Sequence, residues 1–167
     1  MTSKEDFKIV LVGESNVGKT CVISQFVLNK FDPKSQPSTA AQFFEKGIKL
    51  ADNTPITLNI WDTSGQTQYR SVARIFTRDA KALILMYDVT DENSFKELKD
   101  FWYVNNKDFG AKFFVAANKC DLENKKVKDE EGKAFADSIG ADFFSISAKN
   151  NIGLSQLFQR IGEALKK

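Results

Sequence analysis

Residues 9–20 read IVLVGESNVGKT, and this stretch decides the fold. The apolar, mostly β-branched run Ile9–Val12 predicts a buried strand, and the apolar residues that follow Thr20 recur at helical spacing. The loop between them, Gly13–Thr20, fits the pattern G-x-x-x-x-G-K-[ST] in the strand-to-helix context that the pattern requires. A glycine-rich turn with a surface lysine is the alternative. The pattern favours a phosphate-binding loop, and by itself it leaves kinases, ATPases and GTPases open.

The chemistry of this loop suits a nucleotide with several phosphates. Its glycines let the backbone wrap closely around phosphate oxygens, and the helix N-terminus adds oriented N–H groups and a favourable dipole. Lys19 can neutralise the β and γ phosphates, and the Thr20 hydroxyl can bind Mg²⁺. We therefore predict nucleotide contacts from Ser15, Asn16, Val17, Gly18, Lys19, Thr20 and Cys21.

The rest of the chain alternates apolar runs of strand length with segments of helical periodicity. The expected strands are Ile9–Val12, Phe43–Leu50, Ile56–Trp61, Leu83–Tyr87, Phe113–Ala117 and Phe143–Ile146, and the expected helices are Cys21–Val27, Asn93–Lys107, Asp129–Gly140 (with Asp129 as N-cap) and Leu154–Leu165. Asp52-Asn53 predicts a hairpin turn, which makes one strand antiparallel. This order predicts an α/β, P-loop NTPase fold: a six-stranded, mostly parallel sheet with one antiparallel strand and helices on both faces.

Length and composition limit the classes of function. The 167 residues contain no seam, so we expect a single domain over residues 1–167. A net charge of +2, from 24 basic and 22 acidic residues, does not suggest nucleic acid as a partner. The sequence has no histidine, which excludes Ser-His and Cys-His mechanisms, and its two isolated cysteines predict no disulfide framework. We expect no signal peptide and no membrane span.

A second motif, Asn118-Lys119-Cys120-Asp121, follows directly on the apolar strand Phe113–Ala117. Together with Ser147-Ala148-Lys149 it resembles the guanine-specificity motifs of Ras-superfamily GTPases; a polar loop at a strand end is the alternative. Guanine presents an N1–H beside an exocyclic amine, and the Asp121 carboxylate can accept both in a bidentate pair. Adenine has an acceptor at N1, so it would leave a buried mismatch. We predict that GTP or GDP is held through Asn118, Lys119, Asp121, Ser147, Ala148 and Lys149.

The resemblance implies a role for individual residues around the base. Asn118 would brace the loops that surround the base, and Lys119 would lay its stem along the base face. The backbone N–H of Ala148 would donate to the guanine carbonyl. Phe31 occupies the place where the family stacks an aromatic ring near the base, and a core phenylalanine is the alternative.

The run Trp61-Asp62-Thr63-Ser64-Gly65-Gln66 resembles the W-D-T-A-G-Q motif of the same family. The resemblance implies that Asp62 holds the magnesium shell through water, that the Gly65 N–H contacts the γ-phosphate and that Gln66 orients the attacking water. Thr39 matches the switch threonine, which would bind Mg²⁺ only with the γ-phosphate present. A simple turn and an ordinary loop threonine are the alternatives. We therefore predict that the catalytic residues are Gln66, Lys19 and Gly65. The predicted magnesium ligands are Thr20, Thr39 and Asp62.

Several runs are similar to the Rab branch of the superfamily, including Leu58–Gly65 and Tyr87-Asp88-Val89-Thr90 with Ser94-Phe95. The resemblance extends from Phe7 to Leu165. The departures lie where partners and the γ-phosphate would make contact, and they are Ala40-Ala41, Ser64, Thr67 and Arg78-Asp79-Ala80. They leave the hydrolysis rate and the effectors open.

The resemblance predicts a monomeric Rab-like GTPase that hydrolyses GTP and acts as a GTP/GDP switch in vesicle trafficking. Effectors, an exchange factor and a GTPase-activating protein would bind through residues 33–46 and 61–80. The family's prenylated hypervariable tail is absent, so we expect a cytoplasmic protein that reaches the cytosolic face of an endomembrane only through such a tail. Two rivals stay open: a nucleotide-bound interaction module that does not cycle, and a phosphotransferase, against which Asn118–Asp121 argues.

Overall fold

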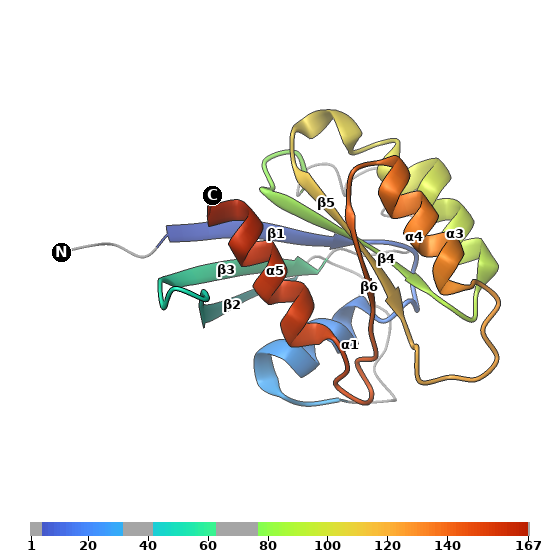
Figure 1. Ribbon diagram of the computed structural model, residues 1–167, viewed down its shortest axis with the longest axis horizontal. Coiled ribbons are helices and arrows are strands. Elements are labelled where there is room, and N and C mark those ends of the chain that lie inside the picture. Colours follow the sequence, from blue (N-terminus) through green and yellow to red (C-terminus); the bar gives the residue numbers. More distant parts are fainter. Residues whose placement is uncertain (1–4, 32–41, 63–76, 167) are drawn as a thin grey trace.

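The computed structural model describes residues 5–31, 42–62 and 77–166, and within them six strands form one sheet. The strands are β1 (Glu5–Val12), β2 (Gln42–Lys49), β3 (Pro55–Asp62), β4 (Ala82–Asp88), β5 (Lys112–Asn118) and β6 (Asp142–Ser145). Their order across the sheet is β2-β3-β1-β4-β5-β6. Every neighbouring pair is parallel except β2 with β3, as expected for strands joined by a hairpin. The predicted sheet is therefore confirmed (Figure 1).

Helices cover both faces of the sheet, as predicted (Figure 1). The helical segments are α1 (Lys19–Ile23), η1 (Ser24–Leu28), α3 (Glu92–Glu97), η3 (Leu98–Tyr103), η4 (Lys107–Phe109), α4 (Asp129–Ser138) and α5 (Leu154–Lys166). In β1, Ile9 and Leu11 pack in the cluster that includes α1 and α5, whereas Val10 and Val12 pack with α3, η3 and α4. Because a central parallel strand is buried on both faces, β1 is apolar without interruption over Ile9–Val12 and β4 over Ala82–Tyr87.

Two predicted helices change their geometry along their length. The segment after the phosphate loop is an α-helix only to Ile23 and continues as a π-helix over Ser24–Leu28. The predicted helix Asn93–Lys107 is likewise α-helical over Glu92–Glu97 and π-helical over Leu98–Tyr103. Both segments are helical, as predicted, although the second helix ends at Tyr103 and not at Lys107. The π-helical geometry was not predicted, because apolar spacing indicates a buried face and does not distinguish i+4 from i+5 hydrogen bonding.

The start of α4 also differs from its prediction. Asp129 was expected to cap the helix, but the N-cap is Lys128, and Asp129 is the first helical residue. Lys128 has an extended backbone, and its N–H donates to Glu131 Oε2 at 2.8 Å. A carboxylate at the third helical position thus satisfies the N-cap backbone, so Asp129 is not needed as the cap. The acidic residues Asp129, Glu130 and Glu131 still occupy the first turn, where they favour the helix dipole.

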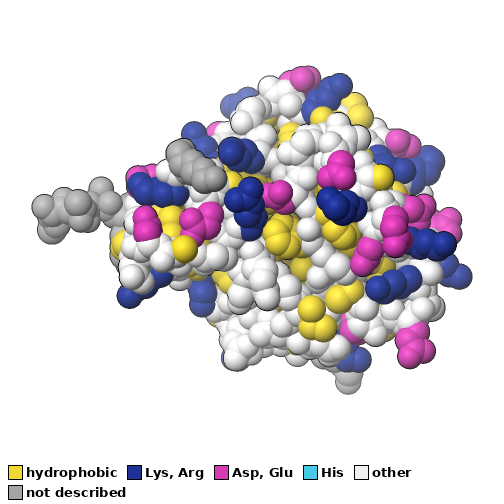
Figure 2. Space-filling model, viewed as in Figure 1, with side chains coloured by type: hydrophobic (Ala, Val, Ile, Leu, Met, Phe, Trp, Pro, Cys, Tyr) yellow, Lys and Arg dark blue, Asp and Glu magenta, His cyan; other side chains and the backbone are white. Residues whose placement is uncertain are grey.

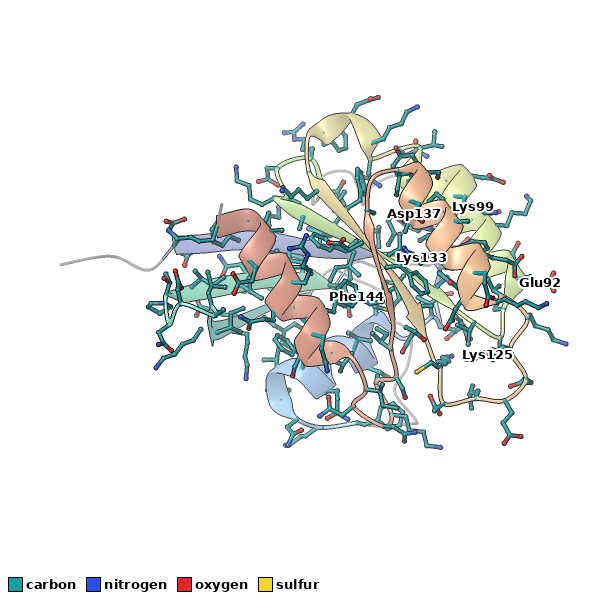
Figure 3. All side chains as sticks on the ribbon, in the orientation of Figure 1. Glu92, Lys99, Lys125, Lys133, Asp137 and Phe144 are labelled. Carbon is teal, nitrogen blue, oxygen red and sulfur yellow. The ribbon has the colours of Figure 1, made fainter. Side chains whose placement is uncertain are left out.

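The surface carries both signs of charge in close mixture. Figure 2 shows basic and acidic side chains interspersed over the face that carries α4 and α5. Lys133 and Asp137, on the outward side of α4, form an ion pair of 3.2 Å between Nζ and Oδ1 (Figure 3).

Phe144, from β6, is half-buried against the α1–α5 side of the core. No helix in the described ranges is long and apolar enough to cross a bilayer.

Candidate functional site

The sequence motifs meet at the carboxyl ends of the parallel strands, where open α/β sheets bind their ligands. The phosphate loop follows β1, Asp62 ends β3, and Asn118 ends β5 beside Asp88 at the end of β4. The loop after β6 brings Ser147 and Ala148 to the same edge. Ile146 N donates to Ala117 O at 2.8 Å, and Cys120 N donates to Ile146 O at 3.0 Å.

Two positions of the phosphate loop accept only glycine. A Cβ on Gly13 would lie 2.3 Å from the Met86 carbonyl oxygen, and a Cβ on Gly18 would lie 2.3 Å from Asn118 Nδ2. Gly18 also has a φ of 101°, in the left-handed region that side chains disfavour. The loop is therefore pressed against β4 on one side and against the base motif on the other.

Lys19 is the first residue of α1 and is only 5% exposed. Its Nζ donates to the carbonyl oxygens of Gly13 at 3.0 Å and Glu14 at 2.9 Å, so the ammonium lies inside the curve of the loop. Burial lowers the pKa of Lys19 to about 8, and the charge of Asp62 opposes this shift. A buried ammonium with carbonyl partners and a nearby carboxylate suits the binding of phosphate oxygens.

Thr20 and Asp62 connect the start of α1 to the end of β3. The Thr20 hydroxyl donates to Asp62 Oδ2 at 2.5 Å, and Asp62 is fully buried. A hydroxyl and a carboxylate are the hard oxygen donors that Mg²⁺ takes, and Mg²⁺ usually fills its other positions with water and phosphate oxygens. The described residues contain no group of three or more His, Cys, Asp or Glu side chains that could hold a metal alone. The donor set therefore fits Mg²⁺ bound together with a nucleotide.

Asn118 connects three segments of the site. Its Nδ2 donates to the Val17 carbonyl oxygen at 2.8 Å, and its Oδ1 accepts from Ala148 N at 3.3 Å. Asn118 is 1% exposed and Ala148 is 3% exposed. The residue thus braces the phosphate loop against the loop after β6. The Ala148 N–H was predicted to donate to guanine. In the structure it donates to Asn118 Oδ1 through a long hydrogen bond.

Asp121 lies against the loop after β6. Its Oδ1 accepts from the buried Ser147 hydroxyl at 2.7 Å, and Ser147 Oγ accepts from Asn150 N at 3.1 Å. Each carboxylate oxygen has two lone pairs, so this bond leaves the Asp121 carboxylate with capacity to accept two parallel N–H groups. Lys149 is exposed beside these residues.

Lys119, the residue after Asn118, also contacts the phosphate loop. Its backbone is left-handed, with φ 71°, and its Nζ donates to the Asn16 carbonyl oxygen at 2.9 Å. The same ammonium forms an ion pair of 2.8 Å with Asp88 Oδ2. Asp88 was missed by the sequence analysis. The only signal in the sequence was its place at the carboxyl end of the apolar run Leu83–Tyr87, and its pairing with Asn118 is visible only in the structure.

Other predicted site residues are half-buried or exposed. Phe31 and Cys21 are half-buried and pack against the α1–α5 side of the core. Ser15 is half-buried, whereas Asn16 is exposed. Gln25 was not predicted, and its Nε2 donates to the Ala148 carbonyl oxygen at 2.8 Å. Thr39, Gly65 and Gln66 lie outside the described residues.

The fold and its glycine-constrained loop at the end of β1 define a P-loop nucleotide-binding protein. The sequence model of the Ras family matches residues 8–167, and the chain belongs to this family. The Ras-related protein Rab-3A of Homo sapiens is 37% identical over 163 residues, which cover 95% of this chain and 73% of that protein. Rab-3B of Bos taurus and Rab-3D of Homo sapiens are each 36% identical over 95% of the chain and 74% of the relative. The chain is thus a Rab-type small GTPase, a class of GTP hydrolases.

Proposed function

We propose that the chain is a GTP/GDP-dependent switch built as one domain over residues 1–167. The observation that carries the proposal is the direct contact between the two motifs, through the 2.8 Å bond from Asn118 Nδ2 to Val17 O. This bond supports the proposal because it holds the loop that would bind phosphate against the segment Asn118–Asp121, whose carboxylate would read the base. A nucleotide that spans the loop and Asp121 would carry phosphates at one end and, at the other end, a base with two adjacent N–H donors. Guanine is such a base.

Each described residue has a part in holding this nucleotide. The loop Ser15–Cys21 would surround the β and γ phosphates, with Lys19 as the neutralising cation. Asp121 would accept the guanine N–H pair, and Asn118 would hold the base loops in place. Phe31 would stack near the base, and Ser147–Lys149 would close the base pocket.

Mg²⁺ would be held by Thr20 and Asp62, with Thr39 added in the GTP state. When bound, it supplies positive charge that stabilises the transferring phosphoryl group. Lys19 and the Gly65 N–H would stabilise the charge that develops on the phosphate oxygens, and Gln66 would orient the attacking water. Positioning and charge neutralisation of this kind account for most of the catalysis in phosphoryl transfer.

The switch surface would be the one that partners recognise, over residues 33–46 and 61–80. Within its described part, Phe43 is 50% exposed and its ring lies 5.1 Å from that of Trp61. Trp61 itself is half-buried against the core, so the exposed apolar surface here comes from Phe43, and an exposed aromatic side chain is typical of protein-binding surfaces. We propose that effectors, an exchange factor and a GTPase-activating protein bind there, that the protein is a monomer, and that it regulates vesicle trafficking at the cytosolic face of an endomembrane.

The test is single-turnover hydrolysis of GTP bound before the reaction, with GTP and GDP separated over hours. The unassisted rate should be on the order of 10⁻⁴ per second. Gln66→Leu should retain GTP binding and reduce hydrolysis, because it removes the residue that orients water. A mutant that hydrolyses at the parent rate refutes this role of Gln66. GTP that is retained without conversion by the parent protein would instead favour an interaction module that does not cycle, and Ser64→Ala would be the first reversion to make.

A further inference from the structure

Asp88 is a buried charge at the edge of the site that the proposed roles leave unused. It ends β4 in register with Asn118 and is 7% exposed. A buried carboxylate is costly unless it is paired and hydrogen-bonded. Its contacts therefore indicate what it does there.

The β4–α3 turn fixes the orientation of this carboxylate. Asp88 Oδ1 accepts from the Thr90 backbone N–H at 2.8 Å and from the Thr90 hydroxyl at 2.7 Å. Asp88 N donates at 3.0 Å to Oγ of the buried Ser94, in the first turn of α3. With Oδ1 held in this way, Oδ2 faces the Lys119 ammonium at 2.8 Å.

Lys119 has much more freedom than the carboxylate that it meets. Its side chain is 35% exposed, against 10% for that of Asp88. A free lysine side chain carries about 2 kcal/mol of rotamer entropy, so holding its head in one place needs a fixed partner. Its Nζ also donates to the Asn16 carbonyl oxygen at 2.9 Å, which makes Lys119 a bridge from Asp88 to the phosphate loop.

We propose that Asp88 is a positioning residue that slows nucleotide release by holding the Lys119 ammonium. The ion pair keeps the Lys119 stem extended across the base position and keeps its head against the phosphate loop. This inference rests on the proposed nucleotide site. It adds that the β4–α3 turn, which holds none of the predicted nucleotide-binding residues, controls through Lys119 how long the nucleotide stays.

The experiment measures release of a fluorescent GDP analogue from the full chain, chased with unlabelled GDP. Asp88→Asn keeps the size and an acceptor for Thr90 but removes the charge. Release should accelerate by about tenfold, because loss of one partner of a hydrogen-bonded charge pair acts mainly on dissociation. Single-turnover GTP hydrolysis should stay within about twofold, because Asp88 acts through Lys119 and not on the phosphates. Unchanged release overturns the proposal.

A double-mutant cycle separates positioning from general damage to the fold. In a Lys119→Met background, adding Asp88→Asn should change release by less than about twofold, since the partner is already gone. Equal acceleration in both backgrounds shows that Asp88 acts without Lys119, and it overturns the proposal. Asp142→Asn is the matched control, because it removes the carboxylate of a half-exposed pair with Arg160 elsewhere on the sheet. A parent chain that binds no guanine nucleotide refutes the proposed function itself.

A milder variant keeps the proposal testable if Asp88→Asn does not fold. Thr90→Val removes one donor to Asp88 and leaves both charges in place. Release should accelerate by about threefold, and Thr90→Ser, which keeps the hydroxyl, should restore the parent rate. Release from Thr90→Val at the parent rate counts against the orientation of Asp88 as the source of the effect.

Discussion

The base side and the phosphate side of the site are held together in different ways. On the base side, hydrogen bonds connect the loops to one another, from Asn118 to Val17 and Ala148 and from Ser147 to Asp121, and the ammonium of Lys119 is paired with Asp88. On the phosphate side, the buried charge of Lys19 has carbonyl partners. The base side is thus a frame made by the fold, whereas the phosphate side offers charge that phosphate oxygens can bind. Changes on the two sides should therefore have different consequences.

The largest expected effect is on the phosphate side. Lys19→Met should weaken binding of GTP and GDP on the order of 10³-fold, because it removes a charge-assisted contact to phosphate from a site shielded from water. The stability of the nucleotide-free chain should change by less than about 1 kcal/mol, since the charge removed was costly to bury. Equilibrium titration and chemical denaturation measure the two quantities. Lys30→Met, at an exposed lysine, is the control, and affinity within tenfold of the parent would contradict the role of Lys19.

Asp121→Asn tests the base side through specificity. The amide cannot accept both guanine N–H groups, so affinity for GTP should fall about 100-fold and affinity for xanthine nucleotides should rise. Competition of each nucleotide against a fluorescent GDP analogue gives the ratio. Asp137→Asn on the outer side of α4 serves as the control. Unchanged selectivity for guanine over xanthine refutes the base assignment.

Asn118→Ala should destabilise the fold on the base side, even when no nucleotide is bound. The change removes partners of the buried Val17 carbonyl and the Ala148 N–H, so the free energy of unfolding should fall by about 2 kcal/mol. Denaturant unfolding of the nucleotide-free chain measures this loss. Asn150→Ala, at an exposed position nearby, should be neutral. Equal stability of the two variants would contradict the view that the base side is braced by the fold.

The smallest effect is a pH dependence of affinity on the phosphate side. Burial lowers the pKa of Lys19 to about 8 in the free chain, and bound phosphates would raise it again. Above pH 8 the free chain has lost the proton and binding must take it up, so affinity falls as pH rises. Between pH 7.5 and 8.5 the fall should be about threefold. Titration calorimetry in buffers of different ionisation enthalpy detects the proton uptake, which Lys19→Met should abolish.

The strands could be predicted because β1, β4 and β5 contain buried apolar runs, whereas β2 and β3 are joined by the turn signal Asp52-Asn53. Their existence, their directions and the antiparallel hairpin are all confirmed. The N-cap of α4 was predicted wrongly, because the acceptor for the Lys128 backbone comes from Glu131 three residues later. The two π-helical segments were missed because periodicity indicates a buried face without specifying the hydrogen-bond spacing.

The sequence by itself determined the kinds of chemistry available, since the phosphate loop and Asn118–Asp121 are continuous runs whose spacing is visible in one dimension. The bracing role of Asn118 was implied by the resemblance, but the tertiary structure alone decided which other residues support these motifs. Asp88 contacts Lys119 because β4 and β5 lie side by side, and Gln25 contacts Ala148 across 123 positions of the chain. Side-chain contacts of this kind depend on sheet order and strand register. A local pattern of residues does not encode either quantity, because both emerge only when the whole sheet packs.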